Sequence, residues 1–265
     1  MISDGTGITA ENLGNSLITQ FETISFEKCT LPYIDTLEKA NAVVLRINRC
    51  YQETGLKPLL FMTLINTEIA ETIKQSQACF FDLFNVFLEP LETELGEKSS
   101  YTVGRTHGVA DTELYRNRIE AVDYALSHDD GVMLRGYDRA DIILIGVSRC
   151  GKTPSCLYMA LHFGVLAANY PFTEEDLVMN QLPASLALYK QKLFGLTIDA
   201  ERLQQIRAGR RPNCKYSSLE QCRIEVSEVE AMYQRESIPY LNSTHYSIEE
   251  IATKVLAISG LKRKF

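Results

Sequence analysis

The sequence predicts an α/β protein with two domains, the second of which is built on a mainly parallel sheet. Short apolar runs that are typical of buried strands alternate with amphipathic helical patterns along the chain. One of these runs, at residues 140–147, passes directly into a glycine-containing loop and then into a helix. We therefore expect an N-terminal α/β domain over residues 1–138 and a second α/β domain over residues 139–265.

The predicted elements follow from hydrophobic spacing and from helix signals. In the first domain we expect a strand at residues 59–64 and helices at 9–21, 67–81, 78–95 and 111–128. In the second domain we expect strands at 140–147, 165–169 and 193–198, and helices at 153–162 and 223–235. The last helix begins after Ser247 with a capping box, in which the Ser247 hydroxyl and the Glu250 carboxylate satisfy free backbone N–H groups.

Composition excludes several functional classes. Hydrophobic residues make up 45% of the 265 residues and charged residues 23%, as in average soluble globular proteins. The formal charge of −7 gives no overall attraction for nucleic acid, so an anion must be held by a local site. No apolar run is long enough to predict a membrane span, and residues 1–20 contain no Lys or Arg, which argues against a signal peptide. Scattered cysteines predict reduced thiols and a cytoplasmic protein.

The pattern that carries chemistry is Gly146-Val-Ser-Arg-Cys-Gly151-Lys152-Thr153, which matches the phosphate-binding loop (P-loop) G-x-x-x-x-G-K-[ST]. Glycines let the backbone approach phosphate oxygens, and the N–H groups point at the anion from the positive end of the following helix. Lys152 adds a full charge at the β- or γ-phosphate, and the Thr153 hydroxyl is a ligand for Mg²⁺. A glycine turn with an exposed lysine is the alternative interpretation. The strand–loop–helix context instead favours a P-loop kinase-like domain whose nucleotide-binding residues are Gly146, Val147, Ser148, Arg149, Cys150, Gly151, Lys152 and Thr153.

Two further sets of residues are candidates outside the loop. Asp199 follows the strand predicted at 193–198, where P-loop proteins place an acidic residue that holds Mg²⁺ through water. The N-cap of the next helix explains Asp199 equally well. A cluster of three arginines would form a lid that neutralises phosphoryl charge, although a solvated basic face is the more common explanation; the cluster consists of Arg207, Arg210 and Arg211.

Proton transfer and contacts with the substrate leave several choices open. Arg149 and Ser148, inside the loop, are candidates for contact with a phosphoryl group or a protein substrate. His107 and His128 lie in polar turns, where a histidine or a neighbouring aspartate acts in proton transfer or simply ends a helix. Asp199 is a further candidate base, and the sequence does not choose among these groups.

Ordered blocks of sequence surround the loop: Ser3-Asp-Gly-Thr-Gly-Ile-Thr-Ala-Glu11, Arg105-Thr-His-Gly108, His128-Asp-Asp-Gly131, Ala168-Asn-Tyr-Pro171, Lys192-Leu-Phe-Gly-Leu-Thr-Ile-Asp199, Asn242-Ser-Thr244 and Ser247-Ile-Glu-Glu-Ile-Ala252. With these blocks the chain resembles, over essentially its whole length, the family of regulatory proteins of phosphoenolpyruvate synthetase and of pyruvate, phosphate dikinase. The resemblance departs at the start, because family members carry a hydrophobic strand before the first block and this chain has only Met1-Ile2 there. We therefore expect a truncated start or a missing first strand.

The resemblance implies a bifunctional phosphotransferase. Such proteins are ADP-dependent serine/threonine kinases that move the β-phosphoryl group of ADP to an active-site threonine of phosphoenolpyruvate synthetase and inactivate it. In the other direction inorganic phosphate attacks the phosphothreonine, releases pyrophosphate and reactivates the synthetase. By position, the family's nucleotide-binding segment is residues 146–153. From the residues themselves, Lys152, Arg149 and Asp199 are the catalytic candidates and Mg²⁺ is the expected cofactor. The family also suggests a homodimer.

Two other functions remain open from the residues themselves. A P-loop kinase of a small metabolite predicts turnover of ATP with a free small molecule and without a protein partner. A non-catalytic nucleotide sensor predicts that the protein inhibits a partner by binding alone, without covalent modification.

Overall fold

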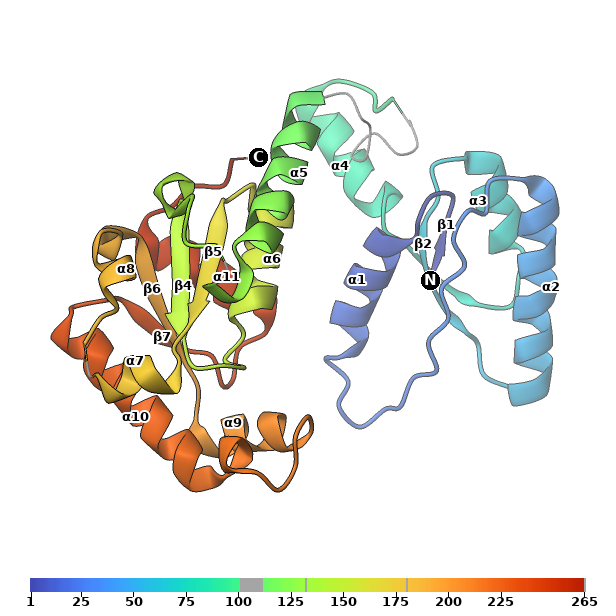
Figure 1. The fold of residues 1–265 in the computed structure, drawn as a ribbon. Helices are drawn as coiled ribbons and strands as arrows, with labels where there is room; N and C mark the ends of the chain where they lie inside the picture. Colours follow the sequence, from blue (N-terminus) through green and yellow to red (C-terminus); the bar gives the residue numbers. More distant parts are fainter. Residues whose placement is uncertain (101–111, 132, 180, 265) are drawn as a thin grey trace. The chain divides into compact units, whose positions relative to one another are not determined.

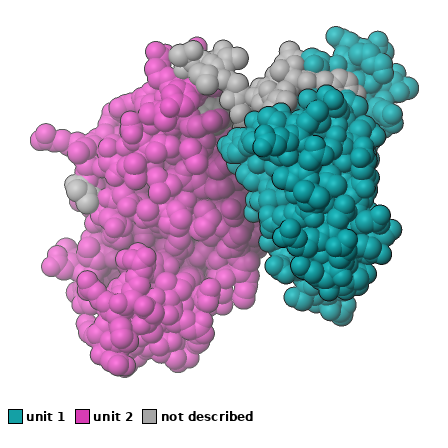
Figure 2. Space-filling view, turned by 90° about the vertical axis from the view of Figure 1, so that its right-hand side faces the viewer, with its two compact units in different colours: residues 1–108 teal, residues 109–265 magenta. Residues whose placement is uncertain are grey.

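The computed structural model describes residues 1–100, 112–131, 133–179 and 181–264, and the chain divides into two compact units, Met1–Gly108 and Val109–Phe265 (Figure 2). Each unit contains a parallel sheet with helices, which confirms the predicted α/β class. The division differs from the boundary predicted near residue 138. The helix α5 (Thr112–Ser127) belongs to the second unit because it packs against α6 (Lys152–Phe163) and β5 (Ala167–Pro171) of that unit.

The first unit has a three-stranded sheet in the order β1-β2-β3, with both pairs parallel. Its elements are β1 (Ile2–Ser3), α1 (Ile8–Ile18), α2 (Leu37–Thr54), β2 (Leu59–Thr63), α3 (Thr67–Lys74), β3 (Cys79–Asp82) and α4 (Asn85–Leu95). Alternation along β2 separates the two faces of this sheet. Leu60 and Met62 join the apolar core formed with α2 and α3, whereas Phe61 lies against Gly14 of α1 on the opposite face.

Two expectations for this unit need correction. The alternative of a missing first strand is wrong, because Ile2 and Ser3 form a two-residue strand that pairs with β2 through Ile2↔Met62 and Ser3↔Thr63; the alternative of a truncated start stays a prediction. Residues 79–82, which the sequence pattern assigned to helices, form β3 because Leu59 to Met62 of β2 satisfy their backbone groups. The apolar spacing of Cys79, Phe80 and Phe81 fits either period, so a partner strand decides the structure.

The second unit has a four-stranded parallel sheet in the order β5-β4-β6-β7. Besides α5, α6 and β5, its strands are β4 (Ile142–Gly146), β6 (Leu193–Thr197) and β7 (Tyr240–Asn242), and its helices include α7 (Glu174–Val178), α8 (Ala184–Ala187), α9 (Ala200–Ala208), α10 (Leu219–Arg235) and α11 (Ile248–Ser259). The predicted strands and helices of this unit are confirmed, with end points that differ by a few residues. The capping box at Ser247 and Glu250 is also present.

The strand order determines where a ligand can approach this sheet. The central strand β4 is buried along its whole length and pairs with β5 on one side and with β6 on the other. The chain leaves β4 for β5 and then crosses back to β6, so the carboxyl end of β4 is a topological switch point. Open parallel sheets bind ligands in the crevice at such points. Helices α6 and α11 pack together on one side of the sheet, and α10 lies on the other (Figure 1).

Among the described residues, no helix combines the length and apolar character that a bilayer crossing requires.

Candidate phosphate-binding site

The loop that follows β4 has the backbone of a phosphate-binding turn. Gly146 ends β4, and a Cβ atom there would lie 2.3 Å from the Leu196 carbonyl oxygen, so no larger residue fits. Arg149 and Gly151 have φ values of 79° and 97°, in the left-handed region that side chains rarely adopt. The helix α6 begins at Lys152 without a side-chain cap, so its first N–H groups face the loop and favour an anion.

Lys152 points into this loop rather than into solvent. Its side chain is buried, and Nζ donates hydrogen bonds to the carbonyl oxygens of Gly146 at 3.1 Å and Val147 at 2.8 Å. Both acceptors are neutral, and a phosphate oxygen forms a stronger, charge-assisted hydrogen bond with an ammonium group. A bound phosphate would therefore replace these carbonyl contacts. This arrangement supports the role that the sequence predicted for Lys152.

A second contact connects the loop to the end of α5. Thr153 donates a hydrogen bond from Oγ1 to Asp129 Oδ1 at 2.8 Å. The same carboxylate oxygen accepts a hydrogen bond from Nδ2 of Asn169, which is buried on β5. The sequence pattern marks the turn at residues 128–131 but does not place Asp129 at the loop, because only the tertiary structure brings α5, β5 and α6 together.

Arg207 supports the loop through a hydrogen bond to the Ser148 carbonyl oxygen and is not part of a lid. Its side chain is fully buried, and Nη2 donates to Glu225 Oε2 at 2.6 Å and to the Ser148 carbonyl oxygen at 3.2 Å. Nη1 donates to the Tyr216 carbonyl oxygen, and the guanidinium lies 4.2 Å from the centre of the Tyr216 ring. Arg210 and Arg211 are exposed on the following turn, whereas Arg207 is buried, so the three arginines do not form the predicted lid.

Asp199 lies at the end of β6, one strand away from the loop. It occupies the N-cap position of α9 without forming a side-chain cap, and its exposed carboxylate accepts a hydrogen bond from Asn242 Nδ2 at 2.7 Å. Ser243, which follows Asn242 in the chain, contacts the loop instead of Asp199: its Oγ donates a hydrogen bond to the Cys150 carbonyl oxygen. Among the described residues, no hydrogen bond joins the Asp199 side chain to the loop.

Two other candidates are limited by their surroundings. Both ring nitrogens of His128 lie against carbonyl oxygens, that of Tyr124 at 2.8 Å and that of Arg135 at 3.0 Å, so neither nitrogen is directed toward a substrate. Burial raises the pKa of the Cys150 thiol, which favours a packing role for that side chain over thiolate chemistry.

His107 lies outside the described residues. Arg149 is exposed and remains a predicted contact for a phosphoryl group.

The residues at the loop fit a divalent cation that is shared with a phosphate group. The Thr153 hydroxyl and the Asp129 carboxylate are hard oxygen donors, which Mg²⁺ prefers, and Mg²⁺ sites commonly combine one or two such groups with substrate phosphates. In the part of the chain that the structure describes, no three His, Cys, Asp or Glu side chains gather into a metal site of their own. A cation at this loop would thus depend on the nucleotide.

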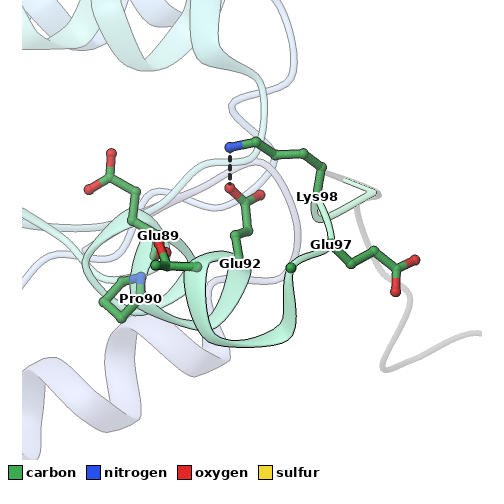
Figure 3. Close-up of a pocket in the computed structure, with 7 residues that line it drawn as sticks. Glu89, Pro90, Glu92, Glu97 and Lys98 are labelled. Atoms are coloured by element: carbon green, nitrogen blue, oxygen red, sulfur yellow. Dashed lines mark hydrogen bonds and ion pairs between the residues drawn. The ribbon is translucent and has the colours of Figure 1, made fainter.

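A hollow in the first unit does not suit a phosphate. It lies at the end of α4, and its lining residues include Glu89, Glu92, Glu97 and Lys98 (Figure 3). Lys98 pairs with Glu92 at 2.8 Å, and this contact lowers the pKa of the Glu92 carboxyl. The hollow is therefore predominantly acidic and would repel an anion.

Comparisons with known proteins agree with the geometry of the loop. A family model described as kinase/pyrophosphorylase matches residues 1–256. A relative from Legionella pneumophila (strain Corby) is 74% identical over 264 residues, which cover 100% of this chain and 97% of the relative. Relatives from Hahella chejuensis and Pseudomonas aeruginosa (strain LESB58) are 57% and 55% identical and cover 99% and 100% of the chain and 96% of each relative. All three bear the name "Putative phosphoenolpyruvate synthase regulatory protein".

A glycine loop between a buried strand and a helix N-terminus, at the carboxyl end of a parallel sheet, is an arrangement in which α/β proteins bind phosphate groups. The chain belongs to the kinase/pyrophosphorylase family, as the match over residues 1–256 shows.

Substitution of Gly146 by alanine is expected to destabilise the second unit by about 1–3 kcal/mol, because the new methyl group would collide with the Leu196 carbonyl oxygen. The measurement is chemical denaturation of both proteins. Gly209→Ala is the matched control, since Gly209 has a helical φ of −62° and a Cβ there would lie no closer than 3.6 Å to its nearest neighbour. Equal stability of Gly146→Ala and wild type would contradict this close approach.

Proposed function

We propose that this protein is a bifunctional enzyme that phosphorylates an active-site threonine of phosphoenolpyruvate synthase with ADP and removes that phosphate by phosphorolysis, forming pyrophosphate. The observation that carries the proposal is a complete phosphate-binding loop in a chain that matches the kinase/pyrophosphorylase family over residues 1–256. The names of its relatives supply the protein substrate.

The kinase direction transfers one phosphoryl group. The threonine oxygen attacks the β-phosphorus of ADP, the bond from that phosphorus to the bridging oxygen breaks, and AMP leaves while the hydroxyl proton is released. Phosphoryl transfer needs positioning and charge stabilisation more than covalent help. Lys152 and the N–H groups at the start of α6 supply positive charge at the transferred group, and Mg²⁺ would add to it when bound.

The phosphorylase direction uses the same groups. An oxygen of inorganic phosphate attacks the phosphorus of phosphothreonine, the threonine oxygen leaves and takes up a proton, and pyrophosphate forms. Negative charge again develops on the oxygens of the transferred phosphoryl group. The positively charged loop at residues 146–153 can therefore stabilise the transferred group in both reactions, which supports assigning both to a single site.

The proposal is tested with purified protein, Mg²⁺, phosphoenolpyruvate synthase and ADP labelled in the β-phosphate, in parallel with ATP labelled in the γ-phosphate. We expect label from ADP on a threonine of the synthase and a matching loss of synthase activity. Failure to label the synthase from ADP would overturn the proposal. Turnover of a free small molecule by ATP would then indicate a metabolite kinase, and nucleotide-dependent inhibition without label would indicate a sensor.

A further inference from the structure

In the hydrogen bond between Thr153 and Asp129 the threonine is the donor, and this affects how its hydroxyl oxygen can bind a cation. A hydroxyl group has one proton and two lone pairs, and the proton of Thr153 is used in the hydrogen bond to Asp129 Oδ1 at 2.8 Å. Its lone pairs consequently face away from the carboxylate. A threonine held in this way presents oxygen lone pairs to a cation, which is the orientation that a metal ligand requires.

The carboxylate is itself held in place from two sides. Asn169 is fully buried on β5, donates from Nδ2 to Asp129 Oδ1 and accepts from the backbone N–H of Asp130 at Oδ1, 3.1 Å away. The backbone N–H of Asn169 also donates to the His128 carbonyl oxygen at 3.2 Å. These hydrogen bonds anchor the turn after α5 to the sheet and restrict the position of the Asp129 carboxylate.

Asp129 retains capacity for a further partner. Both donors, Thr153 and Asn169, use Oδ1, and among the described residues no donor is placed on Oδ2. The side chain is partly buried, so its charge is less screened by solvent than that of an exposed carboxylate. The free oxygen can accept a hydrogen bond from a cation's water shell or bind the cation itself.

We propose that Asp129 and Thr153, rather than Asp199, form the protein's part of a divalent-cation site at the phosphate-binding loop. This inference rests on the proposed function in one respect, that the loop binds ADP. Thr153 supplies a hydroxyl ligand, and Asp129 supplies the negative charge and fixes the hydroxyl. Asp199 is the weaker candidate because its carboxylate is exposed and, in the part of the chain that the structure describes, forms its hydrogen bond with Asn242 and not with the loop.

The test measures binding and contains no synthase, so its failure is distinguishable from failure of the proposed function. ADP is titrated calorimetrically into the full-length protein in EDTA and over a series of Mg²⁺ concentrations. We expect Asp129→Asn to raise the Mg²⁺ concentration that half-maximally strengthens ADP binding by about 10- to 100-fold. Affinity in EDTA is expected to stay unchanged, because asparagine keeps an oxygen that can accept from Thr153.

Three companion variants make the result specific. Asp130→Asn removes the exposed carboxylate next in sequence and is expected to behave as wild type, as is Asp199→Asn. Thr153→Ala is expected to shift the Mg²⁺ dependence in the same direction as Asp129→Asn and provides the test if that variant does not fold. A wild-type Mg²⁺ dependence in both Asp129→Asn and Thr153→Ala, or a shift confined to Asp199→Asn, would overturn the proposal. Loss of ADP binding by Asp129→Asn in EDTA would also overturn it and assign Asp129 to supporting the loop.

Discussion

Replacement of Lys152 by alanine is expected to disable both the kinase and the phosphorylase reaction. Lys152 Nζ is the one side-chain cation that the described residues place inside the loop, where it donates to the Gly146 and Val147 carbonyl oxygens. Loss of a charged hydrogen-bond partner costs about 1.5–3 kcal/mol in affinity. Loss of a donor that stabilises developing charge costs about a further 10²- to 10³-fold in kcat. Both effects are measured by following labelled phosphate on the synthase in each direction.

Lys190→Ala is a suitable control for this variant. Lys190 is an exposed lysine at the amino end of β6, whereas the loop follows the carboxyl end of the parallel neighbour β4, and it pairs with Glu236 at 3.0 Å. We expect wild-type rates in both directions for this control. If Lys152→Ala retained the full phosphorylase rate while losing kinase activity, the two reactions could not share this loop.

Replacement of Arg207 by methionine is expected to lower the free energy of unfolding of the second unit by about 3–5 kcal/mol. The variant would leave Glu225 buried without its ion-pair partner, and an uncompensated buried charge is strongly destabilising. The Ser148 carbonyl oxygen would also lose a donor, so we expect weaker ADP binding by any variant that remains folded. Chemical denaturation and calorimetric titration with ADP measure the two effects.

A second substitution separates loss of the pair from loss of packing. Adding Glu225→Gln to Arg207→Met removes the unpaired charge, and we expect the double variant to be more stable than Arg207→Met alone. Arg210→Met, which changes an exposed arginine three residues away, is expected to have no comparable effect. Additive effects of the Arg207 and Glu225 substitutions would show that the buried pair is not coupled.

The parts of this protein that depend on local sequence could be predicted from the sequence. An apolar strand, a glycine loop and a helix N-terminus are encoded within residues 140–162, so both the position and the secondary structure of the loop followed from spacing and glycine placement. The capping box at Ser247 and Glu250 is equally local and is also present.

Features that depend on distant contacts could not be predicted in the same way. Asp129 contacts both Thr153 and Asn169, which anchors the turn after α5 to β5. No periodic pattern in the sequence encodes these two contacts. The burial of Arg207 depends on Glu225, which lies on another helix, so a basic cluster in the sequence suggested a lid where the structure has an internal support. The domain boundary was placed too late for the same reason, because α5 packs on the second unit.

The most direct test of the central claim is the identity of the product released from phosphorylated synthase. Synthase labelled on threonine by this protein is freed of nucleotide and then incubated with the protein, Mg²⁺ and unlabelled inorganic phosphate. We expect the label to leave as pyrophosphate, synthase activity to return, and Lys152→Ala to prevent both. Release of the label as free phosphate, or release that does not require added phosphate, would contradict phosphorolysis at this site.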